Sequence, residues 1–375
     1  MSSPFDVAVV GAGAAGSACA VHLARDGKSV VVLEQGSFPR SKACGGGMAA
    51  SVQRWFPFDL SPAVDQVIRR VRFTWNLEDP VTAELPGEAP FWIVERSRLD
   101  AFLMDQATAA GAELRCDWPV HGMERQGDTW QLHGPAATVS SRAVVIADGS
   151  TSSLGKPLGL GAARPRFAST VAVELDAHVD EPHTARFDFG LVHHGFCWAF
   201  PRQRGYSIGV GTFIGREAGD PEAVLQRLLP DLGQPSDAGR RQHSVLRIWD
   251  GHHRLHGDGV VLVGDAASLC DPFLAEGIRP ALLSGSLAAA QLSQWLNGDP
   301  LALASYTAQM RRDWGESMAW GKRIAQVFYR VPRIGYQLGL KRPTAPQRIA
   351  QILSGDLGYG DIAQRVIRRL LLQQG

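Results

Sequence analysis

The order of apolar and polar positions predicts a strand, a helix and a second strand within the first 35 residues. Residues 7–10 and 29–33 are short apolar runs, which is typical of buried strands. Residues 17–25 have apolar side chains at helical spacing, and Gly27 follows as a stop signal. The pattern is therefore strand, glycine-rich turn, helix and strand.

Two later regions have their own periodicity. Alternating apolar positions at residues 167–177, 185–192 and 205–215 predict strands of a second sheet. Helical spacing returns over residues 281–296 and 299–331. The last 32 residues, 344–375, predict shorter helices broken by glycine and proline. The expected fold class is α/β, with a second, sheet-based part and C-terminal helices.

Composition and charge exclude several classes of protein. The chain has 375 residues, 45% of them hydrophobic, which is enough for two domains or one large composite. Its 38 basic and 37 acidic residues give a net charge of +1, so no nucleic-acid partner is expected. Five scattered cysteines without a Cys-x-x-Cys pair favour a reducing cytoplasm and indicate no metal site. No apolar run reaches the ~18 residues of a membrane-spanning helix.

The turn after the first strand carries the pattern Gly-x-Gly-x-x-Gly. Gly11 permits a tight turn, Gly13 lets the backbone approach a pyrophosphate, and Gly16 lets helix and strand pack closely. The free N–H groups of the helix N-terminus then face the anion. The residues expected to bind a dinucleotide here are Gly11, Gly13, Ala14, Ala15 and Gly16.

An acidic residue closes the second strand. Glu34, followed by Gln35, lies about 20 residues after the turn, where a carboxylate binds a ribose 2′-hydroxyl. The same carboxylate would repel a 2′-phosphate. The adenosine part therefore belongs to FAD or NAD and not to NADP.

Two later strand ends decide between these dinucleotides. One predicted strand ends at Asp148-Gly149, and another ends at Gly264-Asp265. In this order the segments resemble the flavoprotein group with the p-hydroxybenzoate-hydroxylase type of fold, over most of residues 5–300. The resemblance implies FAD, with Asp148 and Asp265 near its pyrophosphate and ribityl chain. Without that context both would be ordinary turn or capping aspartates.

The same resemblance extends to an arginine and to a helix start. Arg96 matches the arginine that this group places near the cofactor, although a surface ion pair would also explain it. Gly277 and Ile278 lead into a helix whose positive end points at the flavin in that group.

Residues 37–50 contain a glycine triplet, which costs backbone entropy and needs a reason. Pro39, Lys42, Cys44 and the triplet follow the pattern Pro-x-x-Lys-x-Cys-Gly-Gly-Gly and resemble the geranylgeranyl reductase family. A backbone without β-carbons can lie flat against an isoalloxazine ring. The resemblance places Cys44 near the flavin, where it influences the outcome of reduction, whereas a free cysteine is usually a small buried hydrophobe. The expected catalytic group is Cys44, Gly45, Gly46 and Gly47, and Lys42 is expected beside the cofactor.

A second motif of that family is aromatic and lies on a predicted strand. Phe196, Trp198, Phe200 and Pro201 are followed after seven residues by a Gly-x-Gly pair, Gly209 and Gly211. Alternating positions share one face of a strand, so the three rings either line an oily slot for a prenyl chain or form ordinary sheet core. With the family resemblance we favour the slot, with the two glycines leaving space above it.

The chain departs from the family pattern after Asp265. A glycine of the family's Pro-x-x-Gly-Glu-Gly-Ile element is Ala275 here, and Leu274 stands where a small polar residue is common. Phe196 replaces a frequent tyrosine. These changes add bulk near the expected flavin edge and bear on the substrate more than on the cofactor.

The resemblance implies an interleaved chain, with a Rossmann-type FAD-binding domain and an antiparallel-sheet substrate domain. The expected boundaries are 1–50, 95–165 and 258–300 for the FAD-binding domain, 51–94 and 166–257 for the substrate domain, and 301–375 for the C-terminal helical region.

Near the C-terminus an apolar stripe lies beside arginines. Such a helix either packs on its own protein, which we favour, or lies on an anionic membrane surface. The expected location, from the cysteine pattern, is the cytoplasm, and peripheral membrane contact of this helix is left open. The stripe consists of Ile362, Val366, Ile367 and Leu370, beside Arg365, Arg368 and Arg369.

Three functional hypotheses remain. The first is an FAD-dependent reductase of isoprenoid carbon–carbon double bonds, acting on a geranylgeranyl chain of a lipid, quinone or tetrapyrrole ester. The second is a flavin monooxygenase or halogenase on the same fold, and the third is a non-catalytic or electron-carrying flavoprotein. There is no second Gly-x-Gly-x-x-Gly after a strand, so either transiently bound NAD(P)H or a ferredoxin-like carrier is the expected electron donor.

Overall fold

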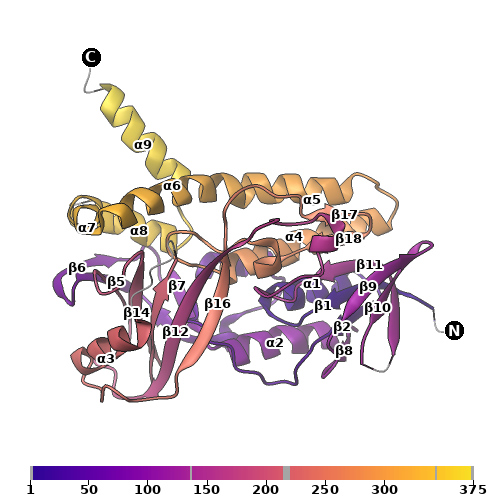
Figure 1. Ribbon diagram of the computed structural model, residues 1–375, viewed down its shortest axis with the longest axis horizontal. Helices are drawn as coiled ribbons and strands as arrows, with labels where there is room; N and C mark the ends of the chain where they lie inside the picture. The colour runs from indigo at the N-terminus through magenta and orange to yellow at the C-terminus, as the bar shows by residue number, and fades with distance from the viewer. Residues whose placement is uncertain (1–2, 136, 214–219, 343, 373–375) are drawn as a thin grey trace.

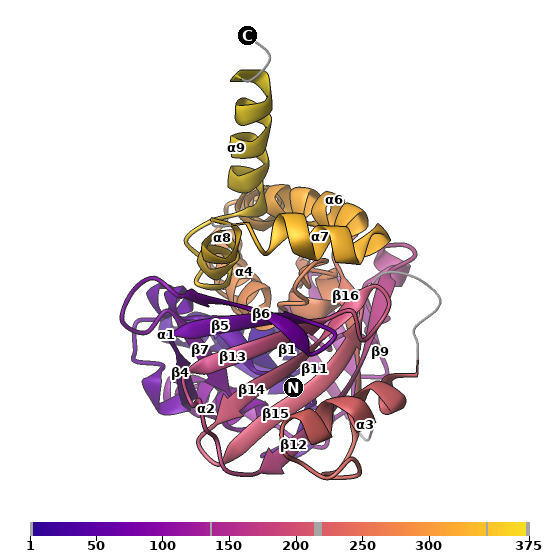
Figure 2. The same cartoon turned by 90° about the vertical axis from the view of Figure 1, so that its left-hand side faces the viewer.

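Two large sheets lie side by side beneath a layer of C-terminal helices, and the last helix projects away from the body (Figure 1). Turned by 90°, the molecule presents the strands of the second sheet in front of those of the first (Figure 2). This computed structural model describes residues 3–135, 137–213, 220–342 and 344–372, and the side chains of residues 366–372 lie outside that description.

The N-terminal pattern forms the centre of an eight-stranded sheet with the order β17-β18-β11-β1-β2-β8, which the β9–β10 hairpin extends. β1 pairs in parallel with β2 and β11, so the carboxyl ends of these strands meet at one edge. The predicted strands are confirmed. The strands of this sheet are β1 (Phe5–Val10), β2 (Val30–Leu33), β8 (Glu113–Arg115), β9 (Gly122–Gln126), β10 (Thr129–His133), β11 (Thr138–Ile146), β17 (His256–Gly257) and β18 (Val260–Leu262).

Helices α1 (Ala14–Arg25), α2 (Arg96–Ala109) and α4 (Ile278–Leu296) pack together around the first sheet. Both α1 and α4 begin three residues before the positions that periodicity predicts: α1 opens with Ala14, Ala15 and Gly16, and α4 opens with Ile278, Arg279 and Pro280, where proline suits the first helical turn. At Gly285 a β-carbon would lie 2.3 Å from the carbonyl oxygen of Ala15, so α1 and α4 touch backbone to backbone.

The second sheet has seven strands in the order β16-β12-β15-β14-β13-β5-β6, antiparallel except for the pairing of β5 with β13. A small sheet of β3, β7 and β4 lies between the second sheet and α4, because β4 and β7 contact β14 and β3 contacts α4. The strands of the second sheet are β5 (Arg70–Trp75), β6 (Glu78–Glu84), β12 (Arg166–Asp176), β13 (Thr184–Phe189), β14 (Gly195–Arg202), β15 (Gly205–Thr212) and β16 (Gln242–Ile248). Those of the small sheet are β3 (Gly47–Ala49), β4 (Val64–Ile68) and β7 (Phe91–Val94).

The alternation predicted for β14 separates two cores. Cys197 and Ala199 face a cluster under α3 (Pro221–Asp231), while the three aromatic residues of β14 belong to the main core on the other face. The predicted strands β12, β13 and β15 are confirmed, and residues 214 and 215 of the last lie outside the described part. The expected domain boundaries stay a prediction.

The C-terminal helices are tied to the loop before α4 by buried hydrogen bonds. Trp314 donates to the carbonyl of Leu269 at 2.8 Å, and the Tyr329 hydroxyl donates to that of Phe273 at 2.9 Å. The helices are α5 (Ala302–Met310), α6 (Glu316–Arg330), α7 (Pro332–Gly339), α8 (Ala345–Leu353) and α9 (Tyr359–Leu372), with a π-helical turn at Arg311–Gly315.

In the described part of the chain, no helix is both long and apolar enough to span a membrane. The stripe predicted on the last helix falls largely outside the description, because the side chains of Val366, Ile367 and Leu370 are not included in it.

Candidate functional site

Two adjoining cavities form one long cleft between the sheets. Gly13, Lys42, Ala147 and Gly149 line both, which places their junction at the carboxyl ends of β1 and β11. One cavity, with about 1080 Å³ of empty space, extends along the glycine turn to Glu34 and Gln35. The other, with about 1150 Å³, extends under the second sheet.

The glycine turn is built for close approach. A β-carbon on Gly11, whose φ is +99°, would lie 2.6 Å from the Ala147 carbonyl, and one on Gly16 would lie 1.9 Å from the Gly11 carbonyl. Gly13 instead meets only the Arg40 and Arg96 guanidinium groups, at 3.3 and 3.8 Å. The turn is therefore closed on the protein side and bare on the cleft side, as a pyrophosphate requires.

Glu34 is buried at the end of β2, with 3% of its surface exposed. Its carboxylate accepts the Ala12 N–H at 2.8 Å and the Gly36 N–H at 3.1 Å. Both bonds fix the carboxylate beside the glycine turn, where a ribose hydroxyl can donate to its remaining lone pairs.

Arg96 and Arg40 converge on one buried carboxylate. Arg96 forms a bidentate pair with Asp100 at 3.0 and 2.8 Å, and Arg40 approaches the same group at 3.3 Å. Burial alone would lower the pKa of Arg96, but Asp100 raises it above its ordinary value. The cluster therefore keeps two guanidinium charges next to Gly13 in the free protein, and a surface ion pair is not the explanation for Arg96.

Asp148 and Asp265, which follow the two later strands, also line the cleft. Asp265 lies 3.6 Å from the Lys42 ammonium group, and both line the second cavity. Asp148 lines the first cavity, burial raises its pKa, and its Oδ1 atom is buried without a hydrogen-bond partner among the described residues. An orphaned buried acceptor of this kind fits a ligand that donates a hydrogen bond.

The glycine triplet lies between β7 and the aromatic face of β14. At Gly46, with φ of +79°, a β-carbon would lie 2.0 Å from the Val94 carbonyl. At Gly47 it would lie 2.6 Å from the Phe91 ring, and at Gly45 3.0 Å from Phe200. The triplet is thus required by packing on its protein side, while its other side lines the second cavity.

Cys44 is partly buried in the same cavity wall, and the Gly46 N–H donates to its sulfur at 3.4 Å.

Phe196, Trp198 and Phe200 line the second cavity together with Phe187 and Phe213. Gly209 and Gly211 were expected to leave space above these rings. The space that they leave is filled by rings of the protein itself. A β-carbon on Gly209 would lie 2.1 Å from the Trp198 indole, and one on Gly211 would lie 2.5 Å from the Phe213 ring. Neither glycine lines the cavity, nor does Pro201, which ends the aromatic run.

The loop before α4 closes the cavity beside the triplet. Leu274, Ala275 and Glu276 line it, and Ala275 adopts φ of +55°, the conformation that the family's glycine would take without strain. Burial raises the pKa of Glu276 to about 7, although Arg279 lies 2.7 Å away and opposes the shift. Gly277 and Ile278 then start α4 with its free N–H groups at the cavity.

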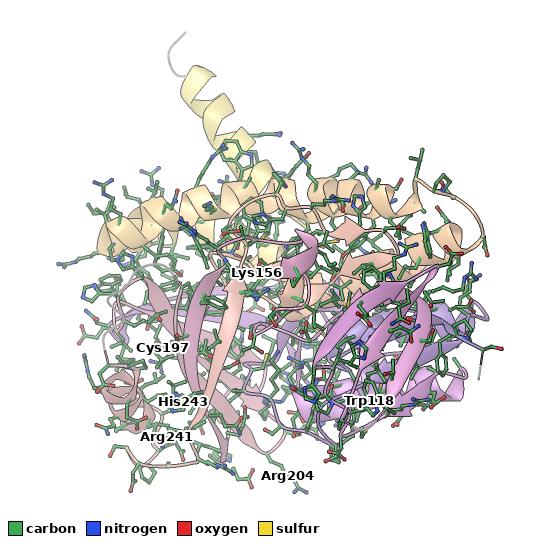
Figure 3. The ribbon with its side chains drawn as sticks, turned by 45° about the vertical axis from the view of Figure 1, so that its right-hand side comes forward. Trp118, Lys156, Cys197, Arg204, Arg241 and His243 are labelled. Carbon is green, nitrogen blue, oxygen red and sulfur yellow. The ribbon has the colours of Figure 1, made fainter. Side chains whose placement is uncertain are left out.

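Sequence reasoning missed part of the site. Arg40 stands at an unspecified position of the Pro39–Gly47 pattern, and Asp100 lies on α2 outside any motif. Trp118, labelled in Figure 3, comes from the segment after β8, far from the glycine turn in sequence, and lines the first cavity. Gly16 packs closely, as its place in the motif predicts, and Gly264, Gly209 and Gly211 also lie close to protein atoms, while their roles at a ligand stay predictions.

Fold and cleft define an FAD-dependent oxidoreductase. The family described as DAO, FAD dependent oxidoreductase, matches residues 6–79. The solved structure of a geranylgeranyl bacteriochlorophyll reductase-like protein from Thermoplasma acidophilum superposes with a TM-score of 0.78 at 21% identity, covering 94% of this chain and 91% of that one. A flavin-dependent brominase superposes with a TM-score of 0.71 at 19% identity, covering 98% of this chain and 100% of that one.

Two curated relatives narrow the class. The menaquinone reductase of Mycolicibacterium smegmatis is 31% identical over 77% of this chain and 76% of its own length. A digeranylgeranylglycerophospholipid reductase of Methanopyrus kandleri is 27% identical over 86% of each chain. The chain belongs to the geranylgeranyl reductase family of FAD-dependent oxidoreductases, and its cofactor is FAD.

We expect Gly46→Ala to destabilise the protein far more than Gly87→Ala. Both glycines have positive φ, but a β-carbon at Gly87 meets nothing within 4 Å, whereas at Gly46 it meets the Val94 carbonyl. Gly87→Ala, the control, should lower the free energy of unfolding by about 1 kcal/mol because of backbone strain. Gly46→Ala should cost ~3 kcal/mol or more in the free energy of unfolding, measured by chemical denaturation. Equal losses for the two variants would contradict this account of the triplet.

Glu276 should make the protein less stable as the pH rises. Its pKa is about 7 when folded and near 4.5 when unfolded, so the unfolded chain ionises first. The contribution is present below pH 4.5 and is lost as the pH rises to about 7, with an upper bound of roughly 3 kcal/mol.

Thermal denaturation from pH 5 to pH 8 tests this expectation. Glu276→Gln should flatten the pH dependence of the melting temperature, whatever its absolute stability, while Glu95→Gln, an exposed control, should leave the slope unchanged. A slope that Glu276→Gln does not alter would show that this carboxyl does not titrate in the range.

Proposed function

We propose that the protein reduces carbon–carbon double bonds of an isoprenoid chain, with the chain held in the second cavity. The observation that carries the proposal is the apolar, aromatic wall of Phe187, Phe196, Trp198 and Phe200, which adjoins the side-chain-free backbone of Gly45 in the lining of one cavity. A flat alkene fits between such a wall and a cofactor ring, whereas a polar substrate would find few hydrogen-bonding partners there.

We infer that FAD occupies the cleft in the direction that its two cavities set. The adenosine ribose would be held by Glu34, and the pyrophosphate by the glycine turn beside Arg40 and Arg96. The isoalloxazine ring would lie in the second cavity beside Gly45 and Gly46. Reduced FAD, when bound, would supply a hydride to one alkene carbon, and a proton would add to the other.

The residues of the chain position the substrate and exclude water from the cavity. Prenyl double bonds are unactivated, so holding the alkene in line and excluding water matter more than an activating group. The rings of β14 are nearly fully buried, with 3–6% of their surface exposed, and Phe196 and Phe200 pack against Phe187 with ring centroids 5.5 and 5.1 Å apart. Such a wall restricts the bound chain with little loss of its own entropy.

The names of the relatives support the same substrate class, since they act on a geranylgeranyl lipid and on menaquinone by name. None of the residues named in the cavity wall selects a headgroup. A lipid, a quinone and a tetrapyrrole ester therefore all belong in the test, with NAD(P)H and a ferredoxin-like carrier as electron donors.

The test is anaerobic turnover of the FAD-loaded protein. After reduction with dithionite, geranylgeranyl compounds with these three headgroups are added, and mass spectrometry should find a gain of two mass units for each reduced bond. Reoxidation of the flavin without any mass gain would favour an electron-carrying protein. Oxygen-dependent hydroxylation or halogenation would favour the monooxygenase alternative.

Trp198→Ala should lower kcat/KM for the accepted prenyl substrate while leaving the FAD content unchanged. The indole forms part of the cavity wall, and losing its contact with substrate should cost about 2 kcal/mol, or roughly thirtyfold. Phe167→Ala is the matched control, because Phe167 lies on β12 of the same sheet but is 50% exposed. If both variants retain full activity, the substrate does not lie against the rings of β14.

A further inference from the structure

Four exposed apolar side chains follow one another along α6 and α7. Val327 is 68% exposed, Val331 43%, Ile334 57% and Leu338 54%, and they make up four of the seven large apolar side chains exposed in the described chain. Val327 lies on α6, Val331 lies in the break between the two helices, and Ile334 and Leu338 lie one turn apart on α7. We call these four residues the α6–α7 surface.

The opposite side of both helices is firmly packed, so this row is not a displaced part of the core. The Phe328 ring contacts Phe189 and Phe273, with ring centroids 5.2 and 5.3 Å apart. The buried Tyr336 hydroxyl donates to the Asp79 carbonyl at 2.7 Å. Both helices therefore bury one face in the core and still expose an apolar row to solvent.

The charge around the row has one sign. Residues 317–355 contain seven of the chain's 38 basic residues and none of its 37 acidic ones, although the whole chain carries only +1. Arg330 and Arg333 are exposed beside the row, and neither forms an ion pair with any described residue. Lys341 is paired with Asp79, which neutralises the acidic group of β6 that reaches these helices.

An apolar row flanked by unpaired arginines fits an anionic lipid surface. The aliphatic side chains can enter the boundary between headgroups and acyl chains, while the guanidinium groups bind lipid phosphates. A second copy of the chain fits poorly, because a twofold contact through this row would bring arginines against arginines. Helix α9 projects from the same side of the body as α6 and α7 (Figures 1 and 2).

We propose that the α6–α7 surface docks the protein on an anionic phospholipid bilayer. Rings then lead inward from the surface to the cavity: Phe328 lies against Phe189, and Phe189 lies 5.8 Å from Phe196, which lines the cavity. Docking there brings the cavity wall within two side-chain layers of the lipid. The proposal does not depend on the reductase activity, because lipid binding is measured without substrate or turnover.

The experiment is cosedimentation of the FAD-loaded full chain with vesicles. One set is pure phosphatidylcholine, and the other contains about 30% phosphatidylglycerol at an ionic strength near 0.1 M. The protein should sediment with the anionic vesicles and not with the neutral ones. Ile334→Ser with Leu338→Ser should weaken the partition coefficient about tenfold, since both side chains lose apolar contact with lipid.

Matched controls separate this surface from the rest of the molecule. Leu301→Ser removes a side chain that is 70% exposed before α5, outside the row, and should leave partitioning unchanged. Arg330→Glu with Arg333→Glu should weaken binding by at least about thirtyfold, whereas Arg98→Glu on α2 should not. All these positions are exposed, so the variants should keep their FAD content and melting temperature.

Three results would overturn the proposal. The first is no binding to anionic vesicles at low salt. The second is equal binding by the wild type and the Ile334→Ser, Leu338→Ser variant. The third is concentration-dependent dimerisation that this variant abolishes, which would assign the row to a second copy of the chain. Loss of prenyl reduction with vesicle binding intact would contradict only the proposed function.

Discussion

The site depends on one stretch of backbone that can carry no side chain. Gly46 accepts a hydrogen bond from the Val94 N–H at 2.9 Å, and its φ is positive. Its neighbours touch Phe91 on one side and Phe200 on the other. The triplet therefore joins the small sheet to the second sheet and leaves its free face to the cleft. Any β-carbon would push these layers apart, and the cavity would lose a wall.

Charged side chains lie at one end of the cleft, and apolar side chains lie at the other. At the glycine turn, cationic groups are held in place by carboxylates: Asp100 binds both Arg40 and Arg96, and Asp265 approaches Lys42. At the other end the lining is aromatic and aliphatic. A dinucleotide with a charged middle and a flat ring at one end fits this gradient, because each part meets the environment that costs least desolvation.

Much of the fold and of the candidate site could be predicted from the sequence, and different elements were predictable for different reasons. The strand, turn and helix at the N-terminus follow from local rules, so their existence was predictable, with α1 and α4 only starting earlier than their apolar spacing indicated. The shared face of the β14 rings follows from the period of a strand. What could not be predicted was which partner fills a space: Gly209 and Gly211 accommodate the Trp198 and Phe213 rings. Asp100 and Trp118 enter through tertiary contacts that carry no local pattern, whereas Glu276 belongs to the family's Pro-x-x-Gly-Glu-Gly-Ile element and only its buried pairing with Arg279 could not be predicted.

The C-terminal helices connect the outer surface to the cavity. Trp314 and Tyr329 hold the carbonyls of Leu269 and Phe273, and the Tyr359 hydroxyl binds the buried Asp271 carboxyl at 2.7 Å. That same carboxyl accepts the N–H of Phe273 at 2.6 Å and so shapes the loop that presents Ala275 and Glu276 to the cavity. The left-handed Ala275 persists because these bonds determine the loop from both ends. The helices that bear the α6–α7 surface therefore also set the position of the cavity wall, since a displacement of α6 must move Tyr329 and with it the start of α4.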